Sequence, residues 1–138
     1  MHTYSVQLRI SGKSLDPSEI TRQLDLEPNQ VRIAGEKRDN GRVWRESLWS
    51  YDGATDPLAP AKEWTSLEEG LLYVLDKLSP KKDLVRGYAG NYEIIWWCGH
   101  FQSSFDGGPT LSVRLLERLA DFGAPLFIDN YFRSDDSE

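Results

Sequence analysis

The sequence predicts an α+β fold of two layers, in which a mainly antiparallel sheet carries helices on one face. Apolar and polar residues alternate over residues 4–10, which is typical of a strand with one buried face. Apolar residues recur at helical spacing in three other segments. The predicted order is strand, helix, strand, strand, helix, strand, helix, strand, without strict alternation. Its simplest arrangement is similar to a ferredoxin-like sandwich with one added helix and one added strand.

The first strand leads into a well-capped helix. Asp16 is suited to cap this helix, with Pro17 at its first position and Glu19 three residues after the cap. We expect the helix to end before Pro28, because the residue that precedes a proline avoids the helical conformation. The sequence therefore predicts that the fold begins with a strand followed by a helix.

A β-hairpin with a basic loop follows the first helix. Residues 31–34 and 43–51 are strand candidates, and the turn dipeptide Asn40–Gly41 lies between them. The loop and its flanks carry a cluster of basic side chains, which we interpret as a solvated loop and edge strand. This cluster consists of Arg32, Lys37, Arg38, Arg42 and Arg45.

The second helix is predicted from apolar residues that recur at helical spacing, namely Trp64, Leu67, Leu71, Val74, Leu75 and Leu78. Ser66 and Glu69 offer another capping box at its start. The dipeptide Ser79–Pro80 ends the run, and residues 81–88 are expected to add a short helical turn.

The last part of the chain predicts a strand, a helix and a strand. Residues 92–102 have apolar side chains on both faces, which is typical of a central strand or of one whose open face meets a partner. A third helix then runs to Gly123, a natural left-handed terminator, and residues 125–132 form the last strand. We expect one α+β domain over residues 1–132 and a frayed acidic tail over residues 133–138.

Composition limits the function classes. The chain of 138 residues has a formal net charge of −6, so we expect nucleic acid to be disfavoured as a partner. No apolar run is long enough to span a membrane, and the opening MHTYSVQLRI lacks the pattern of a signal peptide. The single cysteine excludes an intrachain disulfide. A cytoplasmic location is therefore predicted.

No motif for catalysis, for a metal or for a cofactor is recognised. Cys98 and His100 lie on the same face of a predicted strand, about 7 Å apart, which is too far for the histidine to activate the thiol. Two histidines, one cysteine and scattered carboxylates show no metal-ligand spacing. We therefore assign no catalytic residue, no metal site and no cofactor.

Aromatic and arginine side chains supply the strongest surface hypothesis. The chain has five tryptophans and six tyrosines, and Trp, Tyr and Arg most often anchor interfaces. Each tryptophan could instead pack under a loop or helix, and Arg9 with Asp129 could form only a cross-strand ion pair. Both faces of the strand over residues 43–51 carry a tryptophan, so we expect one of the two to be exposed. The candidate binding residues are Arg9, Trp44, Arg45, Trp49, Trp97, Asp129 and Tyr131.

Several linked patterns in the right order resemble the domain-of-unknown-function family 4279. They are the opening SVQLRISGKSLDPSEITRQLDLEPNQ, the glycine and basic stretch with Trp44, the helix LEEGLLYVLDKL and the ending LLERLADFGAPLFIDNY. The resemblance spans nearly the whole chain and departs from the family at the insert-like SSFDGGP. It implies a bacterial protein of this fold, and it implies no activity and no site residue.

Three functions remain open at this point. The leading prediction is a non-enzymatic protein-interaction module, such as an immunity-type inhibitor or an adaptor, whose acidic half suits a basic partner. So apolar a sheet could equally be buried between two copies of the chain in a homodimer. The alternative is a binder of a small anionic ligand, in which Arg9 or Arg45 clamps the anion between Trp walls. The third is an enzyme of unrecognised type, which requires a cleft with strongly perturbed titratable groups.

Overall fold

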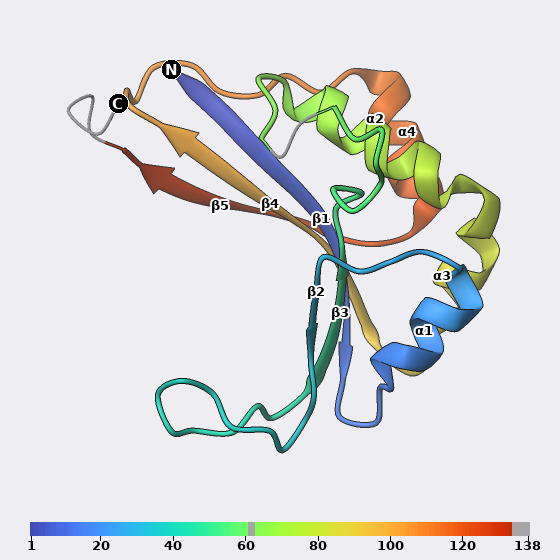
Figure 1. Cartoon of the computed structure of the whole chain (residues 1–138). Helices are drawn as coiled ribbons and strands as arrows, with labels where there is room; N and C mark the ends of the chain where they lie inside the picture. Colours follow the sequence, from blue (N-terminus) through green and yellow to red (C-terminus); the bar gives the residue numbers. More distant parts are fainter. Residues whose placement is uncertain (61–62, 134–138) are drawn as a thin grey trace.

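A computed structural model describes residues 1–60 and 63–133 of the chain and shows an α+β fold (Figure 1). Five strands form one mixed sheet in the order β2-β3-β1-β4-β5. The predicted frayed tail, residues 133–138, lies outside the described residues except for Arg133. The elements are β1 (His2–Gly12), α1 (Pro17–Leu24), β2 (Gln30–Arg32), β3 (Ser47–Tyr51), α2 (Leu67–Leu78), η1 (Ser79–Lys81), α3 (Lys82–Tyr88), β4 (Glu93–Gln102), α4 (Val113–Phe122) and β5 (Leu126–Phe132).

The strand directions confirm the predicted ferredoxin-like variant. β1 is central and pairs antiparallel with both β3 and β4, while β2 pairs antiparallel with β3. The first four strands therefore have the order β2-β3-β1-β4 that a ferredoxin-like β-α-β-β-α-β unit requires. β5 pairs parallel with β4 after the α4 crossover, so α4 and β5 are the added helix and strand.

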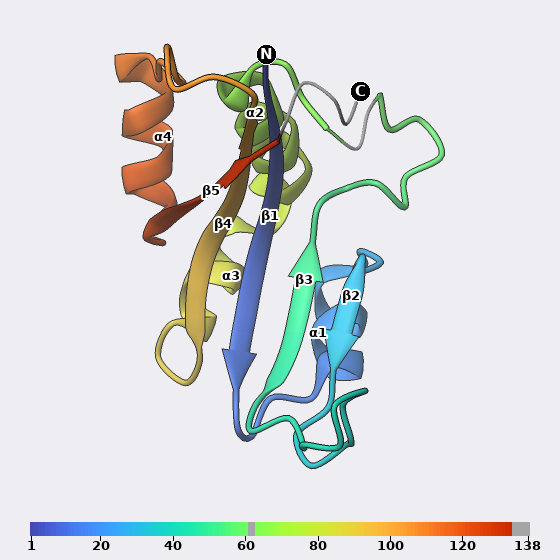
Figure 2. The same ribbon diagram turned by 90° about the vertical axis from the view of Figure 1, so that its left-hand side faces the viewer.

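Helices cover one face of the sheet and leave the other uncovered by the described residues (Figures 1 and 2). The even-numbered residues of β1 point toward the helices, and Leu8 and Ile10 are fully buried there. Trp49 of β3 and Trp96 of β4 lie in the same core. The opposite side, called the open face below, carries the odd-numbered residues of β1 and β4, because successive strand residues alternate between faces.

The helix ends follow the capping chemistry that the sequence predicts. The Asp16 carboxylate accepts a hydrogen bond from the Ser18 amide at 3.0 Å, and Ser66 Oγ accepts one from the Glu69 amide at 3.2 Å. Gly123 ends α4 with φ +87°, a left-handed conformation that a residue without Cβ adopts readily. Trp64 is not part of the second helix, although its spacing suggested it: it pairs with Tyr4 through two backbone hydrogen bonds of 2.7 Å, and α2 begins after the predicted cap Ser66.

The predicted hairpin is present, but its strands are shorter than expected. β2 ends at Arg32 and β3 begins at Ser47, so the predicted strand over residues 43–51 is correct only in its second half. Residues 33–46, called the wall loop below, leave the sheet and project on the side away from the helices (Figure 1). A bridge between Lys37 and Val43 and the left-handed Gly41 close its tip. The wall loop therefore stands beside the open face.

Within the described residues, no helix is both long enough and apolar enough to cross a membrane.

Candidate binding groove

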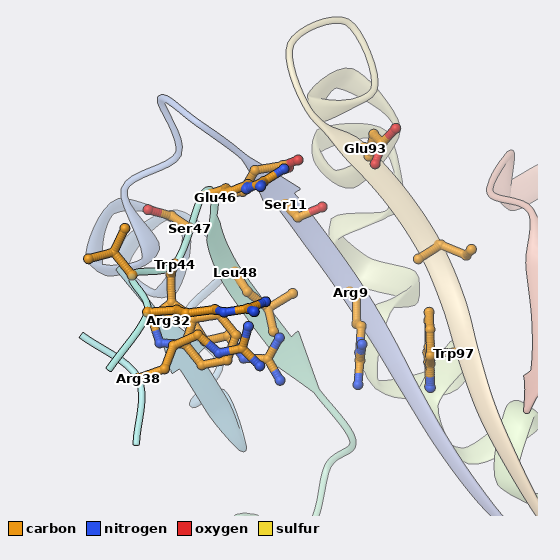
Figure 3. Close-up of a pocket in the computed structure, with 14 residues that line it drawn as sticks. Arg9, Ser11, Arg32, Arg38, Trp44, Glu46, Ser47, Leu48, Glu93 and Trp97 are labelled. Atoms are coloured by element: carbon orange, nitrogen blue, oxygen red, sulfur yellow. The ribbon is translucent and has the colours of Figure 1, made fainter. Parts of the chain in front are cut away.

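A concave groove of about 790 Å³ lies between the open face and the wall loop (Figure 3). β1, β2, β3 and β4 contribute its floor, and the wall loop contributes one side. Arginines are the commonest residues of its lining. The lining consists of Arg9, Ser11, Arg32, Arg38, Arg42, Val43, Trp44, Arg45, Glu46, Ser47, Leu48, Glu93, Ile95 and Trp97.

Arg9 lies flat on Trp97 on the floor of the groove. β1 and β4 pair so that Gln7 is opposite Trp97, which places Arg9 one register step away on the same face. The Arg9 guanidinium carbon is 4.2 Å from the centre of the Trp97 ring, and its Nε donates a hydrogen bond to Gln7 Oε1 at 3.1 Å. Burial and the positive charge of Arg32 lower the pKa of Arg9. The terminal nitrogens of Arg9 have no protein acceptor among the described residues.

The wall loop carries a second stack of arginine on tryptophan. The guanidinium carbons of Arg32 and Arg38 lie 4.1 and 4.2 Å from the centre of the Trp44 ring. The Trp44 amide donates a hydrogen bond to the Glu36 carbonyl at 3.0 Å, which holds this ring beside the groove. Burial and the charge of Arg38 lower the pKa of Arg32. The Nε of Arg32 is buried and finds no hydrogen-bond partner among the described residues.

The groove is positively charged although the whole chain is acidic. Five arginines and two glutamates line it, a formal surplus of three positive charges in a chain of net charge −6. Among the described residues, none of these five arginines forms a salt bridge with a carboxylate. The groove therefore holds unneutralised guanidinium groups that an anion from outside could bind.

Four of the seven predicted binding residues meet in this groove: Arg9, Trp44, Arg45 and Trp97. Trp49 does not, because it faces the helices with none of its surface exposed and donates its indole N–H to Thr21 Oγ1 at 3.0 Å. Of the two tryptophans on the second hairpin strand, the partly exposed one is therefore Trp44.

Asp129 and Tyr131 lie outside the groove. Both belong to β5, which is separated from β1 by β4, so Arg9 and Asp129 are not on adjacent strands and form no salt bridge, although the negative charge of Asp129 acts to raise the pKa of Arg9. The Tyr131 hydroxyl instead donates a hydrogen bond to the Asp129 carboxylate, which raises the pKa of Tyr131. The proposed cross-strand ion pair of Arg9 is therefore wrong.

The basic cluster lies on an exposed loop and on the edge strand β2, as the sequence predicts. Four of its five members, all except Lys37, also line the groove, which the sequence analysis did not anticipate for Arg32, Arg38 and Arg42. The dense positive charge of this segment was the signal that could have indicated it. The other lining residues that the sequence did not single out as binding residues are Ser11, Val43, Glu46, Ser47, Leu48, Glu93 and Ile95.

Cys98 and His100 lie away from the groove and have different surroundings. Burial raises the pKa of the Cys98 thiol to about 12, so the thiol stays protonated at neutral pH. The His100 ring is within hydrogen-bond distance of His2 and of Asn130, at 2.8 Å each. Within residues 1–60 and 63–133, no group of three or more His, Cys, Asp or Glu side chains is arranged to hold a metal ion.

Comparison with known proteins gives a family and no function. No curated protein and no solved structure matches the chain. The sequence model of the domain of unknown function DUF4279 matches residues 2–133, which is almost the entire chain. The chain therefore belongs to the DUF4279 family.

Proposed function

We propose that the protein is a non-enzymatic binding module whose groove binds a small anionic ligand. The observation that carries this proposal is the set of five arginines that line one groove without a carboxylate partner among the described residues. The sequence analysis gives this function as the alternative to a protein-interaction module. Its four central residues, Arg9, Trp44, Arg45 and Trp97, lie together around one cavity, as that alternative requires.

Stacking on a tryptophan ring holds an arginine side chain in a position where it can bind an anion. A guanidinium that lies flat on an indole is held in place through its face, while its N–H groups remain in the plane and free to donate. Phosphate and carboxylate accept two such N–H groups at once. Arg9 on Trp97 and Arg32 on Trp44 are both held in this way.

Electrostatic repulsion within the groove supports the same proposal. The charge of Arg32 acts to lower the pKa of Arg9, while Tyr131 and Asp129 act to raise it, and the charge of Arg38 lowers the pKa of Arg32, so three like charges follow one another along the groove. Unpaired charges brought together and partly removed from water destabilise a protein, and a bound anion relieves this. Proteins tend to keep such unfavourable arrangements where they serve a function.

A titration with hexyl phosphate followed by NMR tests the proposal. The five indole N–H signals report on separate places, and those of Trp44 and Trp97 should shift while those of buried Trp49 and Trp96 stay unchanged. The double variant Arg9→Gln and Arg32→Gln should lose these shifts. The control Arg114→Gln removes an exposed arginine of α4, outside the groove, and should keep them. If hexyl phosphate leaves the Trp44 and Trp97 signals of the unmodified protein in place, the proposal is refuted.

A second candidate function, the binding of a protein partner, is favoured by apolar side chains at the β5 edge. Phe105 and Phe132 are 83% and 55% exposed, and their rings stack at 4.8 Å. Exposed aromatic residues of this kind often anchor interfaces. Native mass spectrometry of the protein from its own host would show an added protein mass for a partner, a doubled mass for a homodimer, or a small increment for a bound ligand.

A further inference from the structure

We infer that the ligand of the groove is an organic molecule with two anionic groups, in which two phosphate or carboxylate groups are joined by an apolar spacer. This inference rests on the proposed function and specifies the class of ligand. Three features of the groove carry it: two separate anion positions, more donors than one anion can use, and an apolar strip between the positions.

The two anion positions are built on different elements. The first, called the floor position, is Arg9 on Trp97, which belong to β1 and β4. The second, called the wall position, is Arg32 and Arg38 on Trp44. β3 lies between β1 and β2, so the backbones that carry Arg9 and Arg32 are about 10 Å apart. Figure 3 shows the two stacks as separate groups on either side of Leu48.

One anion leaves most of the donors unused. Each guanidinium offers five N–H groups, whereas a phosphate monoester offers three terminal oxygens and a carboxylate two. Two bidentate arginines therefore come close to saturating a single anionic group. Five arginines line the groove, and none of them forms a salt bridge among the described residues. A second anionic group would use the donors that the first cannot reach.

The strip between the two positions is apolar. Leu48 of β3 is buried at the base of the groove, and Ile95 of β4 and Val43 of the wall loop line it as well. These side chains offer no hydrogen bond to a continuous chain of phosphates. They fit a hydrocarbon or ring-containing spacer, because moving an apolar group out of water lowers the free energy. The groove of about 790 Å³ is also in the range of pockets that bind organic molecules.

The test compares three ligands that share a six-carbon spacer. Hexyl phosphate carries one phosphate, 1,6-hexanediyl bisphosphate carries two, and suberate carries a carboxylate at each end of six methylene groups. Dissociation constants are measured by calorimetry at constant ionic strength. We expect the bisphosphate to bind at least about tenfold more tightly than hexyl phosphate, because its second group binds as an intramolecular event. Suberate shows whether the site prefers carboxylate or phosphate, and tight binding of either ligand with two anionic groups supports the inference.

Variants confined to one position separate the two. Arg9→Gln disables the floor position, and Arg32→Gln combined with Arg38→Gln disables the wall position. In each variant the bisphosphate should bind only about as tightly as hexyl phosphate binds. The affinity for hexyl phosphate itself should fall only about twofold, because one position remains. The control Arg114→Gln should leave both affinities unchanged. Unshifted indole signals of Trp49 and Trp96 confirm that each variant keeps its core.

The outcomes separate this inference from the proposed function. If the bisphosphate and suberate bind no more tightly than hexyl phosphate, the inference is overturned and the anion site of the proposed function remains. If none of the three ligands shifts the Trp44 and Trp97 signals, both are overturned.

Discussion

Replacing Arg32 by methionine should stabilise the ligand-free protein while weakening its binding of anions. Methionine replaces the aliphatic part of the arginine side chain, but it removes the guanidinium over Trp44, a buried Nε without a partner and a charge beside Arg38. An unsatisfied buried donor costs about 1–3 kcal/mol. The lost contact between guanidinium and ring, 4.1 Å from the Trp44 centre, is worth about 0.5–1 kcal/mol at a partly exposed site. The balance favours the variant by about 1 kcal/mol.

Urea unfolding followed by far-UV circular dichroism measures this difference. In low-salt buffer without phosphate or sulfate, the free energy of unfolding of Arg32→Met should exceed that of the unmodified protein by about 1 kcal/mol, equivalent to roughly 3–4 °C in Tm. The gain should shrink as salt screens the repulsion between guanidinium groups. With saturating hexyl phosphate the order should reverse, because only the unmodified protein gains the full binding energy. A loss of stability in ligand-free buffer would show that Arg32 supports the fold, and the argument from repulsion would fail.

Three further predictions concern the scaffold. Gly70→Ala should destabilise the protein by about 1–3 kcal/mol in spite of the better helix propensity of alanine, because its Cβ would lie 2.8 Å from Trp64 Cδ1; a higher Tm would contradict the packing. Cys98 should resist a thiol-reactive disulfide reagent at about pH 8 until the protein unfolds, since burial raises its pKa to about 12; fast labelling of the native protein would disprove the burial. The ion pair with Lys77 lowers the pKa of Asp56, so its stabilisation is present at neutral pH and is lost as the pH falls through this lowered pKa. Asp56→Asn should therefore flatten the acid side of the stability profile, and an unchanged profile would show that the pair contributes nothing.

The sequence predicted the secondary structure well because the signals are local. Asp16 and Ser66 cap helices as expected, and Gly123 ends one. The alternation over residues 4–10 gave the correct buried face of β1, since a central strand with one helix-covered face must alternate. The added helix and strand also followed from their order along the chain.

Local sequence patterns did not predict which strands are neighbours in the sheet or which tryptophan is covered by a helix. The sequence placed tryptophans on both faces of the second hairpin strand, but only the packing of α1 decides that Trp49 is covered, through its hydrogen bond to Thr21. The ion pair of Arg9 with Asp129 failed because β4 separates their strands. The same long-range pairing brings Arg9 beside the basic cluster from which it is distant in sequence. Such contacts depend on the whole sheet and carry no signature in a short window.

The wall loop has a consequence for how this scaffold could diversify. Its tip is held by local hydrogen bonds, such as that from the Arg38 amide to the Arg42 carbonyl at 2.6 Å, and none of its residues belongs to the buried core. Insertions, deletions and exchanges there should leave folding largely intact while reshaping one side of the proposed anion-binding groove. Arg9 and Trp97, fixed on central strands, would keep the proposed floor position constant. If the groove binds as proposed, transplanting this segment between relatives would exchange ligand preference on an unchanged framework.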